Sequence, residues 1–357
     1  MFNNHKNLLY NCTRKIIPQL IVLVRKVFRS VFILLFLGIW QYSIAQDPEF
    51  SQFYANPLYL SPALAGNTQC GRLILNYRNQ WPALSKAYIT YGASYDMSIP
   101  KINSGVGILA MSDRQGSGAL IRNSISAFYS YKLKVSDPIL ISFGVEAKYY
   151  MEKLDWNKLI FADQIDPTTG NINPSTDETP PDNNQVSVFD FSAGTILSYY
   201  DKWFVGIAVH HLTQPNLSFY NNSNAKLPMR FTVHGGITVN LTEGGLGNKS
   251  NSDFILEPQL LYMQQENFQQ LNAGLYFSKS ILVVGAWFRH NFSNPDAFIA
   301  LVGLQFNNIR IGYSYDFTLS NIGGSSGGAH EISFAWNFCL YKQEKRMRIR
   351  AIKSPGF

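Results

Sequence analysis

Apolar positions alternate with polar or small ones through most of the chain, in segments of about ten residues separated by turn residues. The clearest segment is residues 139–149. One set of alternate positions holds Ile139, Ile141, Phe143, Val145, Ala147 and Tyr149, and the other holds Ser142, Gly144, Glu146 and Lys148. A period of two places the two sets on opposite faces of a strand. Repeated segments of this kind are typical of a transmembrane β-barrel, in which one face meets lipid and the other a polar interior.

Such segments recur fourteen times and give the predicted strands. They lie near residues 71–78, 88–98, 104–112, 120–133, 139–151, 187–199, 203–211, 229–241, 253–263, 268–277, 281–290, 296–306, 309–317 and 329–340. Fourteen is even, as in single-chain bacterial barrels. We therefore predict an all-β fold, a single transmembrane antiparallel β-barrel of about 14 strands in the bacterial outer membrane. A soluble β-sandwich would also alternate, but its strands are usually shorter and its outer face carries more charge.

The lengths of the connections predict an orientation. Outer-membrane barrels have short periplasmic turns and longer outer loops. We therefore expect the N- and C-termini to be periplasmic and the long connections 152–186 and 213–228 to lie outside. Short inner turns are predicted at 100–103, 136–138, 200–202 and 307–308. Three connections depart from the pattern, namely a long inner one at 242–252 and short outer ones at 264–267 and 291–295.

The start of the chain predicts a signal peptide over residues 1–45. Basic residues precede an apolar stretch at 31–40, and the small residue Ala45 suits a cleavage site. Ten apolar residues are too few to cross a membrane as a helix, which takes about 20. We expect Sec-dependent export, cleavage before Gln46, an N-terminal periplasmic or plug segment over 46–70, the barrel over 71–340 and a basic periplasmic tail over 341–357.

The net charge of +7 comes from the two ends of the chain. Of the 30 Lys and Arg, six lie in residues 1–45, which leaves 24 against 23 acidic residues in the exported chain. Residues 341–357 hold six of these 24 and one acid. The pI of about 9.1 therefore gives no indication of nucleic-acid binding. A mean hydropathy of −0.07 is far too low for a bundle of membrane helices.

The segment after the predicted cleavage site carries a distinctive motif. Residues 46–66 read Gln-Asp-Pro-Glu-Phe-Ser-Gln-Phe-Tyr-Ala-Asn-Pro-Leu-Tyr-Leu-Ser-Pro-Ala-Leu-Ala-Gly. This opening resembles that of the PorP/SprF family of type IX secretion-system membrane proteins, through Asp47, Pro48, Phe50, Asn56, Pro57, Pro62, Ala63 and Gly66. Ser61 departs from the family pattern, where Asn is commoner. Further matches lie at 78–82, 163–167, 190–194, 210–212 and 330–333.

The resemblance implies a non-enzymatic outer-membrane barrel that helps particular type IX cargo, often a large surface adhesin of gliding motility, to be exported or retained. The expected partners are that cargo, through its C-terminal domain, secretion-machinery subunits in the periplasm or outer membrane, and the lipid bilayer. The family has no known catalytic residues to carry over. Two alternatives remain open: a FadL-like or porin-like channel for small solutes, and an outer-membrane hydrolase.

The predicted inward faces carry charges of both signs. They are Arg72, Arg78, Arg122, Lys148, Arg230, Arg289 and Arg310 against Asp96, Glu146, Asp190, Glu257, Asp316 and Glu331. A lumen of one sign would indicate an ion-selective pore, whereas mixed signs indicate paired charges that brace the interior. We therefore expect a filled or narrow barrel. Residues 46–70, rich in Tyr, Phe and Pro, are expected to form a plug or docking segment, or else a packed N-terminus.

The long outer loop is the first candidate for contact with an exported partner, because loops of this length are commonly functional. Its acids are Asp155, Asp163, Asp166, Asp177, Glu178 and Asp182. Their spacing lacks the regularity of a known calcium loop. Adjacent His210 and His211 point to opposite faces of a strand and cannot chelate one ion together, and no nucleophile-elbow motif is present. We expect no metal, no cofactor and no catalytic site.

The cysteines predict a covalent link across the barrel seam. Cys12 leaves with the signal peptide, Cys70 precedes the first predicted strand and Cys339 ends the last. Closure of the barrel makes those two strands neighbours, with both cysteines at the same end and facing the lumen. The exported compartment is oxidising. A disulfide between Cys70 and Cys339 is therefore expected, with two free thiols as the alternative.

Overall fold

The computed structural model describes residues 47–68, 70–84, 87–200, 202–242, 245–246, 254–292, 294–319 and 326–339. The predicted signal peptide, 1–45, and the predicted basic tail, 341–357, lie outside the described residues. The compact unit that begins at Asp47 holds all the described residues. No helix among them is long and apolar enough to cross a membrane.

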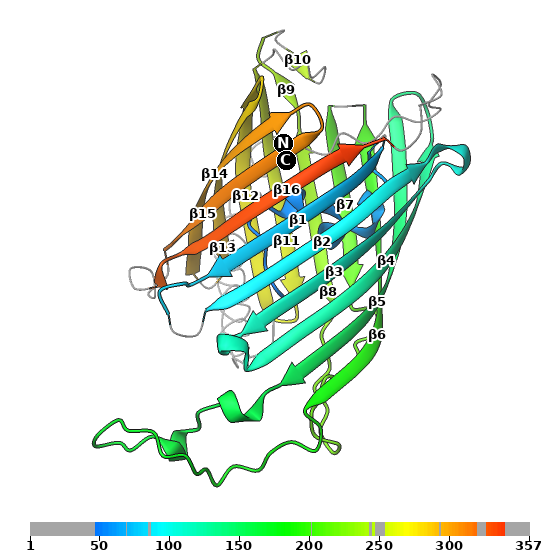
Figure 1. Cartoon of the computed structure of the whole chain (residues 1–357). Coiled ribbons are helices and arrows are strands. Elements are labelled where there is room, and N and C mark those ends of the chain that lie inside the picture. Colours follow the sequence, from blue (N-terminus) through cyan, green and yellow to red (C-terminus); the bar gives the residue numbers. More distant parts are fainter. Residues whose placement is uncertain are drawn as a thin grey trace, which may run out of the picture. The chain divides into compact units, whose positions relative to one another are not determined.

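Antiparallel strands make up most of this unit (Figure 1). Their bounds are β1 Gly71–Gln80, β2 Tyr88–Ile99, β3 Ser104–Gln115, β4 Leu120–Lys134, β5 Ile139–Leu154, β6 Gln185–Tyr199, β7 Trp203–His210, β8 Arg230–Ile237, β9 Val239–Asn240, β10 Gly245–Leu246, β11 Ile255–Gln265, β12 Phe268–Lys279, β13 Leu282–Asn291, β14 Asn294–Phe306, β15 Ile309–Thr318 and β16 Ala329–Phe338. In hydrogen-bonded order β11 to β16 continue into β1 to β8, and β8 pairs with β11. The sheet therefore closes into a ring of fourteen strands, with β9 and β10 as a small extension. The predicted all-β, 14-strand antiparallel barrel is confirmed.

Side chains alternate between the two faces of the barrel wall as the sequence pattern predicts. On β5, Phe143 and Val145 are 48% and 54% exposed on the outer face, whereas Ser142 and Glu146 are 0% and 3% exposed on the inner face. Large apolar side chains are likewise exposed on the other strands of the ring. Lipid is the natural environment for such a surface. The interior holds polar and charged side chains together with a buried apolar cluster that includes Phe53, Ile196 and Trp287.

The predicted strand 229–241 is interrupted. The ladder between β8 and β11 stops at Gly236 opposite Gln259 and resumes where Val239 faces Leu256. Pro258 occupies the gap on β11, and a proline has no N–H to donate to a neighbouring strand. The chain therefore divides into β8 and β9 at Thr238, whose N–H donates to Lys202 O (2.7 Å) on the β7 side.

The two ends of the barrel differ in their connections. At one end, here called the short-turn end, adjacent strands are joined by turns such as 280–281 and 307–308. Asn307 adopts φ +44°, a left-handed conformation that Asn tolerates better than most residues. At the opposite, long-loop end, β5 and β6 are joined by residues 155–184 and β7 and β8 by 211–229. The first of these loops, residues 155–184, extends beyond the strands (Figure 1, bottom) and is hereafter called the arm.

Residues 47–68 form short helical turns inside the ring. These are η1 Phe53–Ala55, α2 Pro57–Leu60 and η2 Pro62–Leu64. Pro57 and Pro62 each begin a turn, because proline fits the first helical position but not a helix interior. Tyr54 and Leu58 are almost completely buried, and the segment packs against inward-facing residues of β3 to β6. The core of the molecule is therefore the interface between this segment and the barrel wall.

Candidate functional site

The amino-terminal segment crosses the lumen from end to end. Asp47 contacts His211 and Arg230, which border the 211–229 loop at the long-loop end. At the short-turn end, Ser130 Oγ donates to Ala65 O (2.7 Å) and Gly66 N donates to Asp96 Oδ2 (2.8 Å).

The two ends of the described chain consequently lie at opposite ends of the barrel. Asp47 is at the long-loop end, whereas Cys339, which follows β16, is at the short-turn end. The predicted periplasmic position of both chain termini concerns residues outside the described part of the chain and stays a prediction. The separation of Asp47 from Cys339 arises because residues 47–66 run through the lumen, and the alternation of the strands gives no indication of this path.

One ion cluster joins the segment to β1, β13, β15 and β16. Arg78 pairs with Asp316 (3.0 Å) and Glu331 (3.1 Å), and Arg289 pairs with Asp316 (2.9 Å). The Glu331 carboxylate also accepts the consecutive N–H groups of Ser51 (2.7 Å) and Gln52 (3.1 Å). Arg289 further contacts two acids, Glu49 (3.4 Å) and Asp296 (2.5 Å). Wall and segment thus satisfy each other's charges.

A second cluster surrounds the first described residue. Asp47 Oδ2 lies 2.7 Å from His211 Nε2 and 2.9 Å from Arg230 Nη1. The other ring nitrogen of His211 lies 2.6 Å from Asp190 Oδ2. Arg230 Nη1 donates to the hydroxyl of Tyr59 (2.8 Å), whose ring centroid is 4.7 Å from the guanidinium carbon. All five side chains are buried or nearly so.

The other predicted lumenal charges pair mainly within the wall. Arg72 makes a two-bond contact with Asp96 (2.8 and 2.9 Å), and Arg122 pairs with Glu152 (3.0 Å). Lys148 lies 3.3 Å from Glu146. Arg310 makes no ion pair with another described residue. The predicted lumenal charges other than Arg310 are buried, and so are three that were not among them, Lys132, Asp113 and Glu152.

The arm uses most of its acidic side chains to hold its own shape. Asp163 Oδ2 accepts the N–H of Asp177 (2.7 Å), and Asp166 Oδ1 accepts that of Thr168 (2.8 Å). These backbone donors lower the pKa of both carboxyl groups, Asp163 and Asp166, from their ordinary value. Asp155 pairs with Lys158 (3.4 Å).

The arm also packs on the 211–229 loop. Asp182 Oδ2 accepts the N–H of Asn221 (2.8 Å), and the hydroxyl of Tyr220 donates to Thr179 O (3.1 Å). Beneath them lies a small apolar cluster of Tyr150, Leu217, Leu227, Val186 and Val188. Of the six predicted acids, only Asp177 and Glu178 have side chains that make no hydrogen bond or ion pair with another described residue. The structure therefore separates four acids with structural partners from two that are free.

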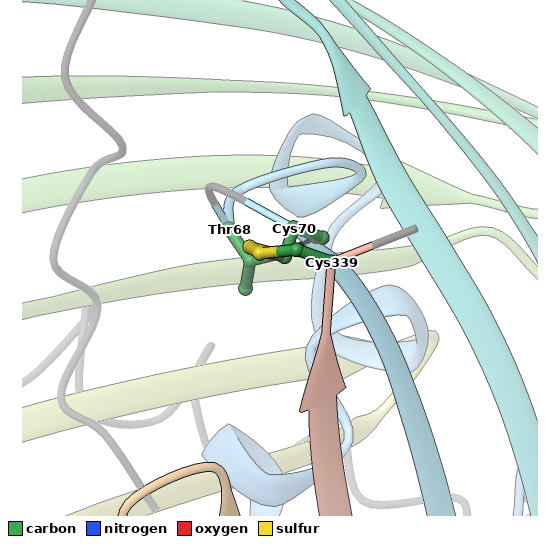
Figure 2. The surroundings of a disulfide bond; sticks show 3 residues. All are labelled: Thr68, Cys70 and Cys339. Atoms are coloured by element: carbon green, nitrogen blue, oxygen red, sulfur yellow. Dashed lines mark hydrogen bonds between the residues drawn. A yellow bond between two sulfur atoms is a disulfide. The ribbon is translucent and has the colours of Figure 1, made fainter. Parts of the chain in front are cut away.

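Cys70 and Cys339 lie side by side at the seam between β16 and β1 (Figure 2). A disulfide joins them in the structure, with their Cα atoms 4.7 Å apart and a sequence separation of 269 residues. Thr68, drawn beside them, donates from its hydroxyl to Cys70 O (2.6 Å). The link connects the end of the lumenal segment to the last strand of the barrel.

Among the described residues, no group of three or more His, Cys, Asp or Glu side chains is arranged to hold a metal ion. His210 and His211 turn to different partners, since His210 Nε2 lies 3.4 Å from Leu60 O and His211 lies between two carboxylates.

A sequence model described as "Type IX secretion system membrane protein PorP/SprF" matches residues 43–336. The chain belongs to the PorP/SprF family. It is accordingly an outer-membrane β-barrel of the type IX secretion system. No curated protein sequence matches it.

Solved structures that are similar to this PorP/SprF protein are distant in sequence. The toluene transporter TodX of P. putida is 9% identical, with a TM-score of 0.48 over 79% of this chain and 93% of that one. The toluene transporter TbuX of Ralstonia pickettii is 11% identical, with a TM-score of 0.46 over 79% and 93%. The Acinetobacter baumannii outer membrane protein Omp33 is 8% identical, with a TM-score of 0.41 over 76% and 100%. Nothing about what those proteins transport extends to this chain.

The PorP/SprF opening motif coincides with the lumenal segment, and the structure gives its residues a physical role. A Cβ added to Gly144 of β5 would lie 2.3 Å from Ala63 N, and one added to Gly105 of β3 would lie 2.2 Å from Ala65 O. Gly66 has φ +59° and would place a Cβ 2.5 Å from Gly105 Cα. The segment therefore touches the barrel backbone directly, which explains why small residues stand at these positions.

Proposed function

We propose that this PorP/SprF-family protein is a non-enzymatic component of the type IX secretion or gliding machinery that captures or anchors a specific cell-surface protein, such as an adhesin. The observation that carries the proposal is the filled lumen. Residues 47–66 cross the barrel and meet charged and polar side chains of opposite walls. A barrel filled in this way suits protein binding at its rim better than passage of solutes.

The rival function, a FadL-like or porin-like channel, requires a continuous path through the lumen. At the long-loop end, Arg230 and Arg289 hold the segment through Asp47 and Glu49. At the short-turn end the segment lies in backbone contact with Gly105 and Gly144. Both ends of a channel would have to be cleared before a solute could pass, which favours the binding function.

The arm is the proposed contact surface. It holds six acids against one lysine, and the side chains of Asp177 and Glu178 are left free. Ile165 and Ile172 form an isolated β-bridge and are 46% and 57% exposed. An exposed apolar pair beside free carboxylates suits a partner with an apolar patch and basic residues around it. We take this end of the barrel as the cell-surface side, because long loops lie there in outer-membrane barrels.

Binding to the C-terminal domain of a type IX surface adhesin from the same cell tests the proposal. The double variant Asp177→Asn/Glu178→Gln is expected to bind that domain about 2- to 30-fold more weakly than the wild type, since each exposed charge pair contributes roughly 0.2–1 kcal/mol and apolar contacts remain. Asp137→Asn is the matched control, because Asp137 is an exposed acid in a turn at the opposite end of the barrel. Equal binding by all three proteins would exclude the arm as the contact surface.

A further inference from the structure

The lumenal segment is held differently at its two ends. Its outer end, residues 47–52, is held by ion pairs and hydrogen bonds to side chains of the wall. Its inner end, residues 63–66, lies against the backbone of β3 and β5 with no room for a Cβ. Four residues beyond Gly66, Cys70 is bonded to the last strand. The inner end is therefore fixed, and only the outer end can be exchanged without moving the barrel wall.

The contacts of Asp47 have the form of a ligand in a binding site. One carboxylate oxygen meets two converging groups, His211 Nε2 at 2.7 Å and Arg230 Nη1 at 2.9 Å. Each of these is oriented by a further partner, His211 by Asp190 and Arg230 by the Tyr59 hydroxyl. An arginine whose guanidinium group is held in one orientation in this way is pre-organised to bind a carboxylate.

Arg230 depends on Asp47 for its charge balance. Within the described chain, no other carboxylate forms an ion pair with Arg230, and its Nε has no hydrogen-bond partner. A buried guanidinium without an anion is strongly unfavourable. If the outer end of the segment leaves, the site therefore requires another carboxylate.

We propose that His211 and Arg230 form a carboxylate-binding site at the long-loop end, occupied at rest by Asp47 and able to take an acidic peptide segment of the partner instead. The partner's identity rests on the function proposed above, whereas the site itself does not. Exchange starts from the long-loop side, because the segment is anchored at the other end. The amino-terminal segment is then a built-in ligand that keeps the site filled until a partner arrives.

The test uses the full-length barrel and a fluorescent peptide with the sequence of residues 46–53, Gln-Asp-Pro-Glu-Phe-Ser-Gln-Phe. The Asp47→Asn variant removes the resident carboxylate from the site and is expected to bind this peptide at least tenfold more tightly than the same peptide with Asn in place of its Asp. Wild-type protein is expected to bind neither, because its own Asp47 competes at high effective concentration. Equal binding of the two peptides to Asp47→Asn, or binding of neither, would overturn the proposal.

Glu49→Gln is the matched control. This variant removes the neighbouring acid of the same segment, but Arg289 still pairs with Asp296 and Asp316. Because no buried arginine then lacks a carboxylate partner, no peptide binding is expected. Adding Arg230→Gln to Asp47→Asn should abolish the binding. Each variant counts as a folded barrel if heating shifts its band in gel electrophoresis by the same amount as it shifts that of the wild type. If the peptide binds as expected while Asp177→Asn/Glu178→Gln leaves partner binding unchanged, the carboxylate site stands and the proposed role of the arm fails.

Discussion

At the scale of single residues, glycines decide how closely the amino-terminal segment approaches the wall. Gly144 and Gly105 offer bare backbone to Ala63 and Ala65, at distances that no side chain permits. Hydrogen bonds then fix the register, since Ser142 Oγ donates to Ala63 O (2.7 Å) and Lys132 Nζ donates to Gly66 O. The small residues of the segment are thus matched to small residues of the strands.

Gly144→Ala is predicted to destabilise the folded protein by about 1–3 kcal/mol, the usual effect of forcing an extra carbon into a packed interior. The new Cβ would lie 2.3 Å from backbone atoms of Pro62 and Ala63, which cannot rotate away as a side chain could. Denaturant unfolding in detergent measures the change. Gly92→Ala is the control, because a Cβ there has no neighbour nearer than 3.6 Å. The argument fails if both variants lose the same stability.

At the scale of elements, the strands and the position of the long loop could be predicted from the sequence, whereas the internal contacts of the arm could not. Alternation records which face of each strand meets lipid, so the predicted strands fall within a few residues of β1 to β8 and β11 to β16. The break at Thr238 escaped prediction because it depends on Pro258 in the neighbouring strand. In the arm the six acids look alike in sequence. Only the distances in the structure show that the carboxylates of Asp163 and Asp166 accept backbone N–H groups, whereas the Asp177 carboxylate makes no hydrogen bond with another described residue.

The turns of the arm are predicted to loosen in acid. Hydrogen bonds from backbone N–H groups hold the pKa of Asp163 and of Asp166 below the ordinary value, so their contribution to stability is complete above the pKa of an unfolded Asp, about 3.9. It is lost as the pH falls through the lower pKa of the folded state. The protection of the Thr168 and Asp177 amides, measured as the exchange rate relative to the intrinsic rate at each pH, should therefore be unchanged between pH 7 and 5. At pH 3 it should fall, while the protection of the barrel strands is retained. Asp163→Asn should remove most of this pH dependence at Asp177.

At the scale of the whole molecule, closure of the ring explains the position of the cysteines. Cys70 and Cys339 are 269 residues apart in sequence, yet the pairing of β1 with β16 brings them together. The sequence predicted this proximity because strand parity and barrel closure are global properties. It could not predict the path of residues 47–66, since they have no strand period and their partners, such as Glu331, lie about 280 residues away.

The disulfide is predicted to be present in the exported protein and to add about 2–5 kcal/mol to its stability, because it restricts a very long loop of the unfolded chain. Alkylation of the unfolded protein without reductant should label neither cysteine, and labelling after reduction should modify both. Cys70→Ser/Cys339→Ser should still form the barrel, since the β1 and β16 ladder is complete without the bond. Full labelling without reductant would show that the thiols are free.

Lumen closure is the property that most sharply separates the binding function from the channel. The segment is held by ion pairs at one end and by backbone contact at the other, so thermal motion of one end does not clear the path. The purified wild-type protein is therefore predicted to give no steady conductance in planar bilayers. Deletion of residues 47–66 should produce stable ion currents, provided that the strands remain paired, as a heat-dependent band shift would show. Steady large currents from the wild type would indicate instead that solutes pass around the segment, and the channel would then be the better account of this barrel.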